Sequence, residues 1–340
     1  MPHPKIGFAV VGLGSIAQSS VLPAFSRCKQ AKLVALVSRD RKKAVDLARR
    51  FRAQVTYDMR NLAACLANPD VSAIYIATPQ GVHLDTTVKA AKAGKHVLCE
   101  KPLAATFEQA RKMVAACRRH GVFLMTAYRK YYESSSLYMK RLIRDGELGR
   151  IDVIHTAFSE LYRPGISPPW LLNAKLAGGG PLMDLGVYCV NTSRWLVDAI
   201  PVEVSAQSWL KHAARFKEVE EGIVFRMNFA SGLIVQAAST YGAAPSSFVN
   251  VQGTKGWASL APAFPFDEER WITGKIQGRW FEQKFKVVDE FAPQLDAFAT
   301  AIRTRRPVEP DGIQGVTDLA IIRAIYESAR RNRAVAVQYD

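Results

Sequence analysis

The first 127 residues alternate short apolar runs with longer amphipathic segments, and this alternation restricts the fold more than any other feature of the chain. The apolar runs predict strands at Ile6–Val11, Leu33–Val37, Ala73–Ala77, His96–Cys99 and Val122–Thr126. The segments between them have helical periodicity at Ile16–Ser26, Arg41–Phe51, Arg60–Ala67, Leu84–Ala93 and Phe107–Arg119. Continuous apolar strands separated by helices are typical of βαβ units, in which helices cover both faces of a parallel sheet.

The pattern changes after Gly149. Strand-like runs now follow one another, at Ile151–Phe158, Glu203–Leu210, Gly222–Phe229, Leu233–Ser239 and Phe248–Gln252. One helix begins near Met183, and two more close the chain at Phe291–Arg303 and Val316–Arg331. We therefore predict an α/β chain of two domains: a dinucleotide-binding domain over residues 1–128 and an α+β domain over residues 129–340. The second domain is expected to hold a large, mainly antiparallel, open-faced sheet and to bind substrate and partner subunits.

Basic residues are concentrated in the N-terminal part. The formal net charge is +16, and residues 1–150 hold 26 Lys and Arg against 10 Asp and Glu, whereas the rest of the chain is balanced. Such an excess can steer an anionic cofactor or substrate, mark nucleic-acid binding, or keep the surface solvated. We expect no nucleic-acid partner despite this excess.

Composition excludes several classes of protein. Hydrophobic residues make up 49% of the chain and charged residues 22%, as in globular proteins, and no apolar run is long enough for a membrane helix. The five cysteines and six histidines form no disulfide or metal-ligand pattern, so we expect no metal site. The chain starts without a signal peptide, which predicts a cytoplasmic protein, or a periplasmic one only if a leader was removed.

A phosphate-binding loop follows the first predicted strand. Gly12-Leu13-Gly14-Ser15-Ile16-Ala17 is a G-x-G-x-x-A sequence that opens the first helix. Gly12 allows the tight turn, Gly14 lets the backbone approach a pyrophosphate, and Ala17 permits close packing of helix on strand. The free N–H groups of the helix start, at Ser15 and Ile16, would bind the phosphates.

The end of the second strand selects the cofactor. An NAD enzyme usually has Asp or Glu here, whereas this chain has Ser38 and Arg39, with Lys43 further on. A hydroxyl, a guanidinium and an ammonium suit a 2′-phosphate, so NADP is favoured over NAD. Asp40 is a competing ribose ligand, but it can equally be the N-cap of the helix that opens at Arg41.

Cys99-Glu100-Lys101-Pro102-Leu103 follows a further strand, at the sheet edge where open α/β sheets bind ligands. Here the chain resembles the glucose–fructose oxidoreductase/inositol dehydrogenase (Gfo/Idh/MocA) family, whose hallmark is Glu-Lys-Pro after the Rossmann strands. The resemblance covers almost the whole chain. It includes Ala77-Thr78-Pro79 with His83, Ala127-Tyr128-Arg129, the segment from Gly178-Gly179-Gly180 to Asn191, and Leu319–Ala329.

The resemblance implies roles for individual residues. Lys101 would lie beside the nicotinamide and the reacting carbon, Glu100 would support it, and the peptide before Pro102 would be cis. The implied cofactor contacts outside the two loops above are Thr78, Pro79, His83, Glu100, Lys101, Arg129 and Trp170. The implied substrate contacts are Lys101, Arg129, Asp184, Tyr188 and Asn191.

A polar helix face carries the second group of site residues. If the helix begins at Met183, then Asp184, Tyr188 and Asn191 share one face, as in the wall of a polar pocket. Alternatively, Asp184 complements the helix dipole and Tyr188 is a half-buried aromatic. Most relatives have His at position 188, and the glucose–fructose oxidoreductase branch has Tyr. The catalytic residues so implied are Lys101 and Tyr188, which handle the hydroxyl proton, and Asp184, which orients the substrate.

Two positions depart from the family pattern without removing a residue of this chemistry. Leu171, after Trp170, stands where relatives often have Arg, and Gln80 stands where Asn is usual.

We predict an NADP-dependent oxidoreductase that transfers a hydride between the nicotinamide and a secondary alcohol or carbonyl of a sugar or related cyclic polyol. The alternatives are an enzyme that recycles a tightly bound cofactor, in sugar–sugar oxidoreduction or redox-assisted glycoside cleavage, and an NADP-sensing regulator without catalysis. We also expect a homodimer or homotetramer. The two closing helices could cover one face of the second sheet and leave the other for a partner subunit.

Overall fold

The computed structural model describes residues 4–340, which form two compact units. The first unit holds the chain up to Arg129 together with Asp289–Val316, and the second holds Lys130–Val288 and Thr317–Asp340. We expected residues 129–340 to form one domain. The segment Asp289–Val316 instead clusters with the first unit.

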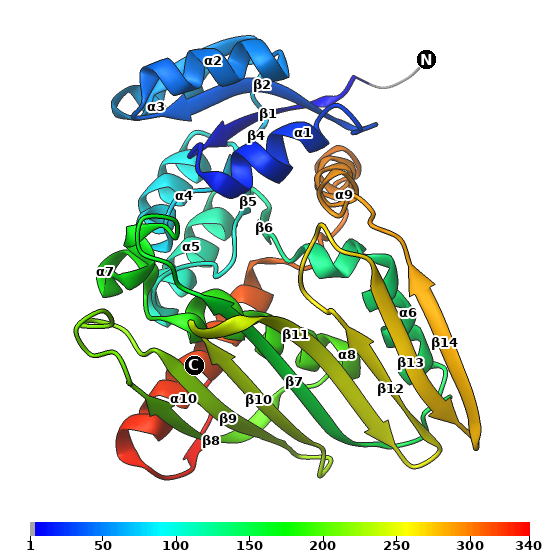
Figure 1. Cartoon of the computed structure of the whole chain (residues 1–340). Coiled ribbons are helices and arrows are strands. Elements are labelled where there is room, and N and C mark those ends of the chain that lie inside the picture. Colours follow the sequence, from blue (N-terminus) through cyan, green and yellow to red (C-terminus); the bar gives the residue numbers. More distant parts are fainter. Residues whose placement is uncertain (1–3) are drawn as a thin grey trace. The chain divides into compact units, whose positions relative to one another are not determined.

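The first unit is built on a parallel sheet of six strands in the order β3-β2-β1-β4-β5-β6 (Figure 1). The strands are β1 (Ile6–Val11), β2 (Ala31–Ser38), β3 (Val55–Asp58), β4 (Ala73–Ile76), β5 (His96–Cys99) and β6 (Leu124–Thr126). The connecting helices are η1 (Ala17–Val21) with α1 (Leu22–Ala24), α2 (Arg41–Phe51), η2 (Met59–Asn61) with α3 (Leu62–Ala67), η3 (Gln80–Val82) with α4 (His83–Lys92), and α5 (Phe107–Arg119). The predicted parallel sheet is confirmed. The sequence did not indicate β3, because this four-residue edge strand is only half-buried.

Helix α9 (Phe291–Thr304) belongs to the first unit, where it packs beside β1 and β2. Its Asp296 carboxylate accepts hydrogen bonds from the N–H groups of Lys29, Gln30 and Ala31 at 2.7–3.1 Å. The ring of Phe298 lies 6.2 Å from that of Phe8 on β1. The expectation that this helix covers the second sheet was therefore wrong.

The second unit is built on a sheet of nine strands in the order β14-β13-β12-β11-β7-β10-β9-β8-β15. The strands are β7 (Ile151–Leu161), β8 (Pro201–Trp209), β9 (Gly222–Phe229), β10 (Ile234–Thr240), β11 (Gly242–Gly253), β12 (Gly256–Ala261), β13 (Arg270–Ile276), β14 (Arg279–Phe285) and β15 (Val335–Ala336). All neighbours pair antiparallel except β10 and β7. The predicted, mainly antiparallel sheet is confirmed. The strands β12 to β15 were not predicted.

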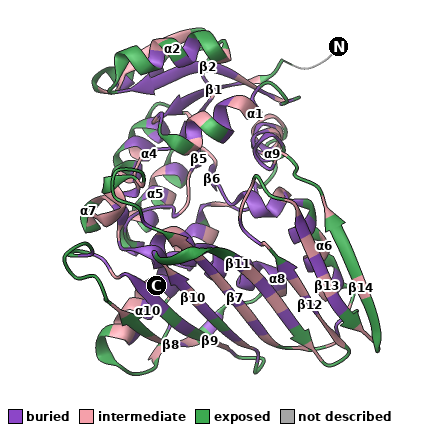
Figure 2. Cartoon of the chain, viewed as in Figure 1, coloured by how far each residue is buried: buried purple, intermediate pink, exposed green. Residues whose placement is uncertain are grey.

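Helices cover one face of this sheet. They are α6 (Ser134–Arg144), η6 (Leu182–Gly186) with α8 (Val187–Val197), and α10 (Gly312–Arg331) (Figure 1). The short helices η4 (Arg129–Tyr132), and η5 (Pro169–Leu172) with α7 (Ala174–Ala177), precede α6 and η6 in the chain. Helix α6 packs on β12 and β13, α8 packs on β7 and β10, and Ser328 of α10 accepts a hydrogen bond from the N–H of Ala206 on β8. Buried and more exposed residues alternate along these strands (Figure 2).

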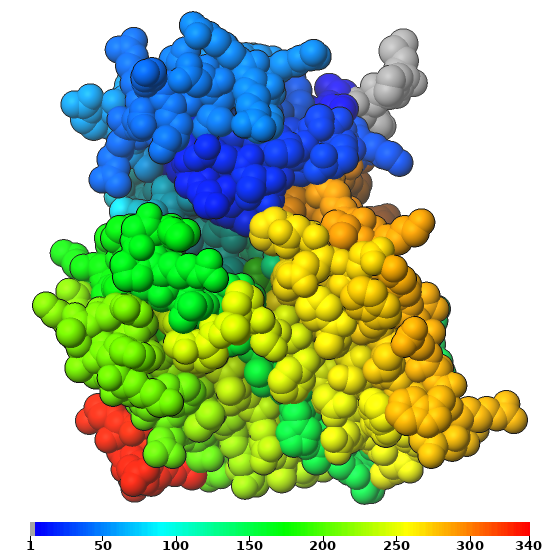
Figure 3. Space-filling model, in the orientation of Figure 1, coloured from blue at the N-terminus to red at the C-terminus, as the bar shows by residue number. Residues whose placement is uncertain are grey.

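Figures 1 and 3 look onto the opposite face of the second sheet, where no helix of the described residues lies. This uncovered face is the open face predicted from the sequence. Within residues 4–340, no helix is long and apolar enough to cross a membrane.

Candidate functional site

The backbone of the phosphate loop is shaped by two glycines. Gly12 has φ +93°, and a Cβ there would lie 2.6 Å from the carbonyl oxygen of Ala77. Gly14 is exposed, with no atom within 4 Å of where its Cβ would be. The N–H of Gln18 donates to the Gly14 carbonyl, so helical bonding starts at this glycine, while Ala17 is fully buried. This loop has the tight turn and the open approach that a pyrophosphate needs.

The end of β2 carries the residues that we expect to bind a 2′-phosphate. Ser38 is buried, and its hydroxyl accepts a hydrogen bond from the Asp40 N–H at 3.0 Å. Arg39 and Lys43 are exposed. The Asp40 carboxylate accepts a hydrogen bond from the Lys43 N–H at 2.9 Å and caps α2. Of the two roles predicted for Asp40, ribose ligand and N-cap, this is the N-cap. One of the Asp40 oxygens is therefore already used.

The loop after β4 contains polar atoms that lack a partner. The hydroxyl of Thr78 and the amide oxygen of Gln80 are buried, and neither has a hydrogen-bond partner among the described residues. Unpaired buried polar atoms are uncommon, and a site for a polar ligand explains them. In the sequence, Gln80 is recognisable only as a departure from the family pattern. The burial of its side chain could not be predicted.

His83 lies beneath this loop and does not reach the surface. It is fully buried, with Nε2 at 2.7 Å from the Thr78 carbonyl oxygen and Nδ1 at 3.1 Å from that of Leu103. Burial lowers the pKa of His83. The structure thus places His83 as a link between the loops after β4 and β5, and the predicted direct cofactor contact does not agree with its burial.

Glu100 and Lys101 follow β5, and the Lys101–Pro102 peptide is cis, as the resemblance implied. The buried phenol of Tyr75 on β4 donates to a Glu100 oxygen at 2.7 Å, and the Lys101 N–H donates to the other at 3.3 Å. Burial raises the pKa of Glu100, while the Tyr75 hydrogen bond and the Lys101 charge oppose that rise. Two hydrogen bonds therefore hold the Glu100 carboxylate in place beside the Lys101 backbone. The sequence did not reveal Tyr75, because it lies within an ordinary apolar strand.

Arg129 is buried at the end of the first unit. It forms an ion pair with the buried carboxylate of Glu290, and its guanidinium lies 5.9 Å from the centre of the Phe291 ring. Both partners come from the segment that starts at Asp289, and the sequence assigned this segment and Arg129 alike to the second domain, whereas both belong to the first unit. The predicted cofactor and substrate contacts of Arg129 stay predictions.

In the second unit, Asp184 and Tyr188 lie on consecutive turns of η6 and α8. The buried phenol of Tyr241 donates to an Asp184 oxygen at 2.9 Å. The Tyr188 ring packs 5.8 Å from Phe158 on β7 and 5.4 Å from Phe264. Asp184 is thus held by a hydrogen bond and Tyr188 by two aromatic rings, and their role in the wall of a polar pocket stays a prediction.

A second carboxylate lies near Asp184. Glu160 follows Phe158 by two residues on β7, so it points to the same, helix-covered face. Burial raises the pKa of Glu160, and the charges of Asp184, Glu268 and Asp267 raise it further. Three carboxylates therefore act on Glu160, and the Arg163 guanidinium opposes them. The sequence analysis missed Glu160, because strand alternation alone does not show which helix covers it.

Asn191 is placed differently from its prediction. Its amide nitrogen donates to the buried Asp318 carboxylate on α10 at 2.8 Å, and Arg194 pairs with the same carboxylate at 3.0 Å. Asn191 thus links α8 to α10, and its buried amide does not support the predicted substrate contact. Trp170 lies half-buried on η5, and its cofactor contact stays a prediction.

Lys101 belongs to the first unit, and Asp184 and Tyr188 belong to the second. Their meeting in one cleft stays a prediction. Among the described residues, no group of His, Cys, Asp or Glu has a metal-binding arrangement.

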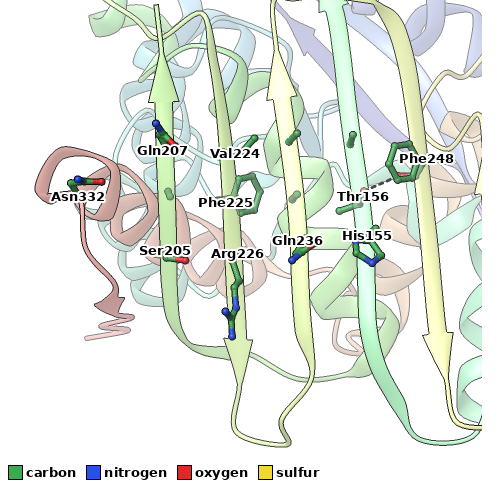
Figure 4. A pocket seen from close by; sticks show the side chains of 14 residues that line it. His155, Thr156, Ser205, Gln207, Val224, Phe225, Arg226, Gln236, Phe248 and Asn332 are labelled. Carbon is green, nitrogen blue, oxygen red and sulfur yellow. Dashed lines mark hydrogen bonds between the residues drawn. The ribbon is translucent and has the colours of Figure 1, made fainter.

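A hollow of about 560 Å³ lies on the second sheet, away from these residues (Figure 4). It is lined by Arg226, Gln236 and His155, which are paired neighbours on β9, β10 and β7. They alternate with the residues that face α8, so they project from the uncovered face. The hollow is therefore separate from the Asp184–Tyr188 site.

Comparison with known proteins decides the family. Residues 6–128 match the model of an oxidoreductase family with an NAD-binding Rossmann fold, and residues 136–259 match the GFO/IDH/MocA C-terminal domain. The D-xylose 1-dehydrogenase [NADP(+)] of Haloarcula marismortui is 31% identical over 97% of this chain and 92% of its own length. The chain belongs to the Gfo/Idh/MocA oxidoreductase family. The predicted family, Rossmann fold and enzyme class are confirmed.

Two further members of the family are similar over nearly the whole chain. The 1,5-anhydro-D-fructose reductase of Ensifer adhaerens is 30% identical over 97% of this chain and 98% of its own. The crystal structure of aldose-aldose oxidoreductase from Caulobacter crescentus, complexed with glycerol, has 34% sequence identity and a TM-score of 0.92. The match covers 98% of this chain and 100% of that one.

Proposed function

We propose that this protein is an NADP-dependent oxidoreductase that acts on a secondary alcohol or carbonyl group of an uncharged sugar or cyclic polyol. The observation that carries the proposal is the pair of supported side chains on η6 and α8. Asp184 is fixed by Tyr241, and Tyr188 is fixed by two aromatic rings one turn later. A carboxylate and a phenol so arranged can bind and deprotonate a hydroxyl group.

The first unit would hold NADP. The loop from Gly12 to Ala17 would bind the pyrophosphate, and Ser38, Arg39 and Lys43 would bind the 2′-phosphate. Asp40 supports this choice, because it already caps α2 and is less available to a ribose. The Haloarcula relative, named as an NADP(+) enzyme, points the same way. The unpaired oxygens of Thr78 and Gln80 fit a polar ring substituent near the nicotinamide.

Bound nicotinamide supplies the hydride acceptor or donor. The chain itself would move the proton: the Tyr188 phenolate, stabilised by the Lys101 ammonium, would take it from the substrate hydroxyl and become the phenol. Glu100, held by Tyr75, would keep the Lys101 backbone in place. Asp184, held by the Tyr241 hydroxyl, would orient the substrate.

The carboxylates near Tyr188 favour uncharged substrates. Asp184, Asp267 and Glu268 each raise the pKa of Glu160 through their charge, and Arg163 opposes them. A carboxylate accepts hydrogen bonds from sugar hydroxyls, whereas it repels the carboxylate of a sugar acid or a phosphate ester. We therefore propose aldoses and related polyols as substrates, with sugar acids and sugar phosphates excluded.

The test is an assay of purified protein for reduction of NADP and NAD with a panel of sugars. D-xylose and D-glucose are compared with D-glucuronate and glucose 6-phosphate, and formation of reduced cofactor is followed by absorbance. Turnover with a neutral sugar and NADP supports the proposal. A preference for the charged sugars, or no turnover with any neutral sugar, contradicts it.

A second candidate function is oxidoreduction between two sugars with a cofactor that does not leave. The similarity to the aldose-aldose oxidoreductase, at 34% identity, favours this alternative. An absorbance scan of the purified protein before any cofactor is added separates the two. Bound reduced nicotinamide that is discharged by adding a second sugar indicates the recycling enzyme.

We also propose that the uncovered face of the second sheet pairs with another copy of the chain. Trp280 is 69% exposed, it packs against Trp257, and Val224 on β9 is 43% exposed. Exposed apolar side chains on a sheet face are typical of a subunit interface. Light scattering at micromolar concentration should give a dimer or tetramer, and a monomer would refute the assembly.

A further inference from the structure

A carboxylate from a distant loop meets the start of η6. One Glu220 oxygen accepts a hydrogen bond from the Gly180 N–H at 3.0 Å, and the other accepts from the Leu182 N–H at 3.0 Å. The half-buried Tyr326, on α10, donates its phenolic hydrogen to this second oxygen at 3.0 Å. The residue at the N-cap position of η6 makes no side-chain cap. Glu220 therefore supplies the acceptor that the free amides of this helix start require.

Two glycines allow this close approach. A Cβ on Gly179 would collide with the Tyr326 hydroxyl, and a Cβ on Gly180 would collide with the carbonyl oxygen of Glu220. The Gly178-Gly179-Gly180 run therefore serves, at its last two positions, to seat the helix start against Glu220 and Tyr326. No such role could be read from the sequence, because Tyr326 lies 106 residues from Glu220.

The clamp formed by Glu220 and Tyr326 is close to the pair formed by Asp184 and Tyr241. Burial raises the pKa of Tyr241, and Asp184, Glu220 and Tyr326 raise it further, so Tyr241 lies near enough to interact with all three. Asp184 follows the clamped Leu182 by two residues. A displacement of the helix start therefore moves Asp184 first and Tyr188 one turn later.

We propose that Glu220, supported by Tyr326, is a positioning residue that sets where Asp184 and Tyr188 present their oxygens to the substrate. Glu220 acts through the first turn of η6. Its own loop is held by the next residue, because the Glu221 carboxylate accepts from the N–H groups of Lys211 and His212 at 2.7 and 2.8 Å. The inference rests on the proposed function for the roles of Asp184 and Tyr188.

The test is Glu220→Gln, which keeps the shape but replaces one acceptor oxygen by a donor that faces a backbone N–H. Glu218→Gln is the matched control: it is an exposed residue of the same loop, and its carboxylate accepts from the Ala174 N–H of α7 instead. Two properties are measured: amide hydrogen exchange of the peptide that spans residues 178–190, and kcat and KM with NADP and a neutral sugar.

We expect Glu220→Gln to speed exchange in this peptide and to lower kcat by about tenfold, the scale of one lost hydrogen bond to a charged group. The KM for NADP should not change, because the first unit is untouched. Tyr326→Phe removes one of the three hydrogen bonds and should lower kcat by about threefold. Glu218→Gln should behave as the wild type in both measurements.

Unchanged exchange in Glu220→Gln overturns the clamp. Faster exchange with a wild-type kcat overturns the positioning role. If the wild type oxidises no neutral sugar, the proposed function fails, and exchange alone decides whether Glu220 holds the helix start. If Glu220→Gln does not fold, Tyr326→Phe takes its place, because it keeps the carboxylate. Amide exchange and kcat of Tyr326→Phe then decide in the same way.

Discussion

The phosphate loop of the first unit and the Asp184–Tyr188 pair of the second unit are built differently. In the first unit, the phosphate loop offers backbone groups, and six consecutive residues from Gly12 to Ala17 contain nearly all of its geometry. In the second unit, the side chains are held by hydrogen bonds between residues far apart in sequence, such as Asp184 with Tyr241 and Glu220 with Tyr326. A backbone site is therefore sensitive to added atoms, whereas a side-chain site is sensitive to single lost hydrogen bonds.

The largest effect on cofactor binding is expected at Gly12. Gly12→Ala places a Cβ 2.6 Å from the Ala77 carbonyl oxygen at φ +93°, a strain of about 1–3 kcal/mol, and should weaken NADP binding about a hundredfold. Gly14→Ala is the matched variant, because its Cβ meets no protein atom. It should weaken binding by about tenfold at unchanged stability. Thermal melts and NADP titration of both variants check this, and equal stability of the two would break the comparison.

Arg39→Ala should give a smaller loss, restricted to one cofactor. A charge-assisted hydrogen bond contributes about 1.5–3 kcal/mol, so NADP affinity should fall about tenfold to a hundredfold while NAD affinity stays the same. Arg49→Ala is the control, since Arg49 is exposed on α2 and lies near Asp46. Titration of the wild type and both variants with NADP and with NAD measures these affinities. Tighter binding of NAD than NADP by the wild type contradicts the assignment.

Replacement of Glu100 should have the smallest effect on stability, visible as a change in its pH dependence. Because burial raises the pKa of Glu100, its contribution to stability is complete below its ordinary pKa and is lost as the pH rises through the raised value. Glu100→Gln removes this titration but keeps an oxygen to accept from Tyr75. The free energy of unfolding of the variant, relative to that of the wild type, should therefore increase as the pH rises. Urea denaturation at a series of pH values measures the free energy of unfolding of both proteins. The same pH dependence in variant and wild type would contradict a raised pKa of Glu100.

The parts of the fold that could be predicted are those fixed by interactions within one segment of the sequence. The helix Arg41–Phe51 and the strand Ile6–Val11 have the predicted boundaries, since periodicity and capping act within one segment. The placement of α9 could not be predicted. It depends on the Asp296 carboxylate meeting the amides of Lys29 to Ala31, more than 260 residues away.

The candidate site shows the same limit. The positions of Lys101, Asp184 and Tyr188 were available from motifs and a family resemblance. Their supports, Tyr75 and Tyr241, were not, because a tyrosine in an apolar strand looks like an ordinary core residue. His83 and Asn191 were assigned to ligands, whereas the structure uses their polar atoms to join elements of the protein.

The account depends most on Lys101 and Tyr188 acting together, although they come from different units. Lys101→Ala and Tyr188→Phe should each lower kcat by about a hundredfold or more, the usual scale of general acid–base catalysis. The double variant should be little slower than either single one, because residues that act as one unit are not additive. NADP binding should survive in all three, since the phosphate loop is unchanged.

The kcat of these three variants, measured with NADP and a neutral sugar, is therefore the most direct test. Similar losses in both single variants and in the double variant would support one shared proton-transfer step. Tyr188→Phe at the wild-type rate, with Lys101→Ala inactive, would contradict it and leave Lys101 as the sole acid–base residue.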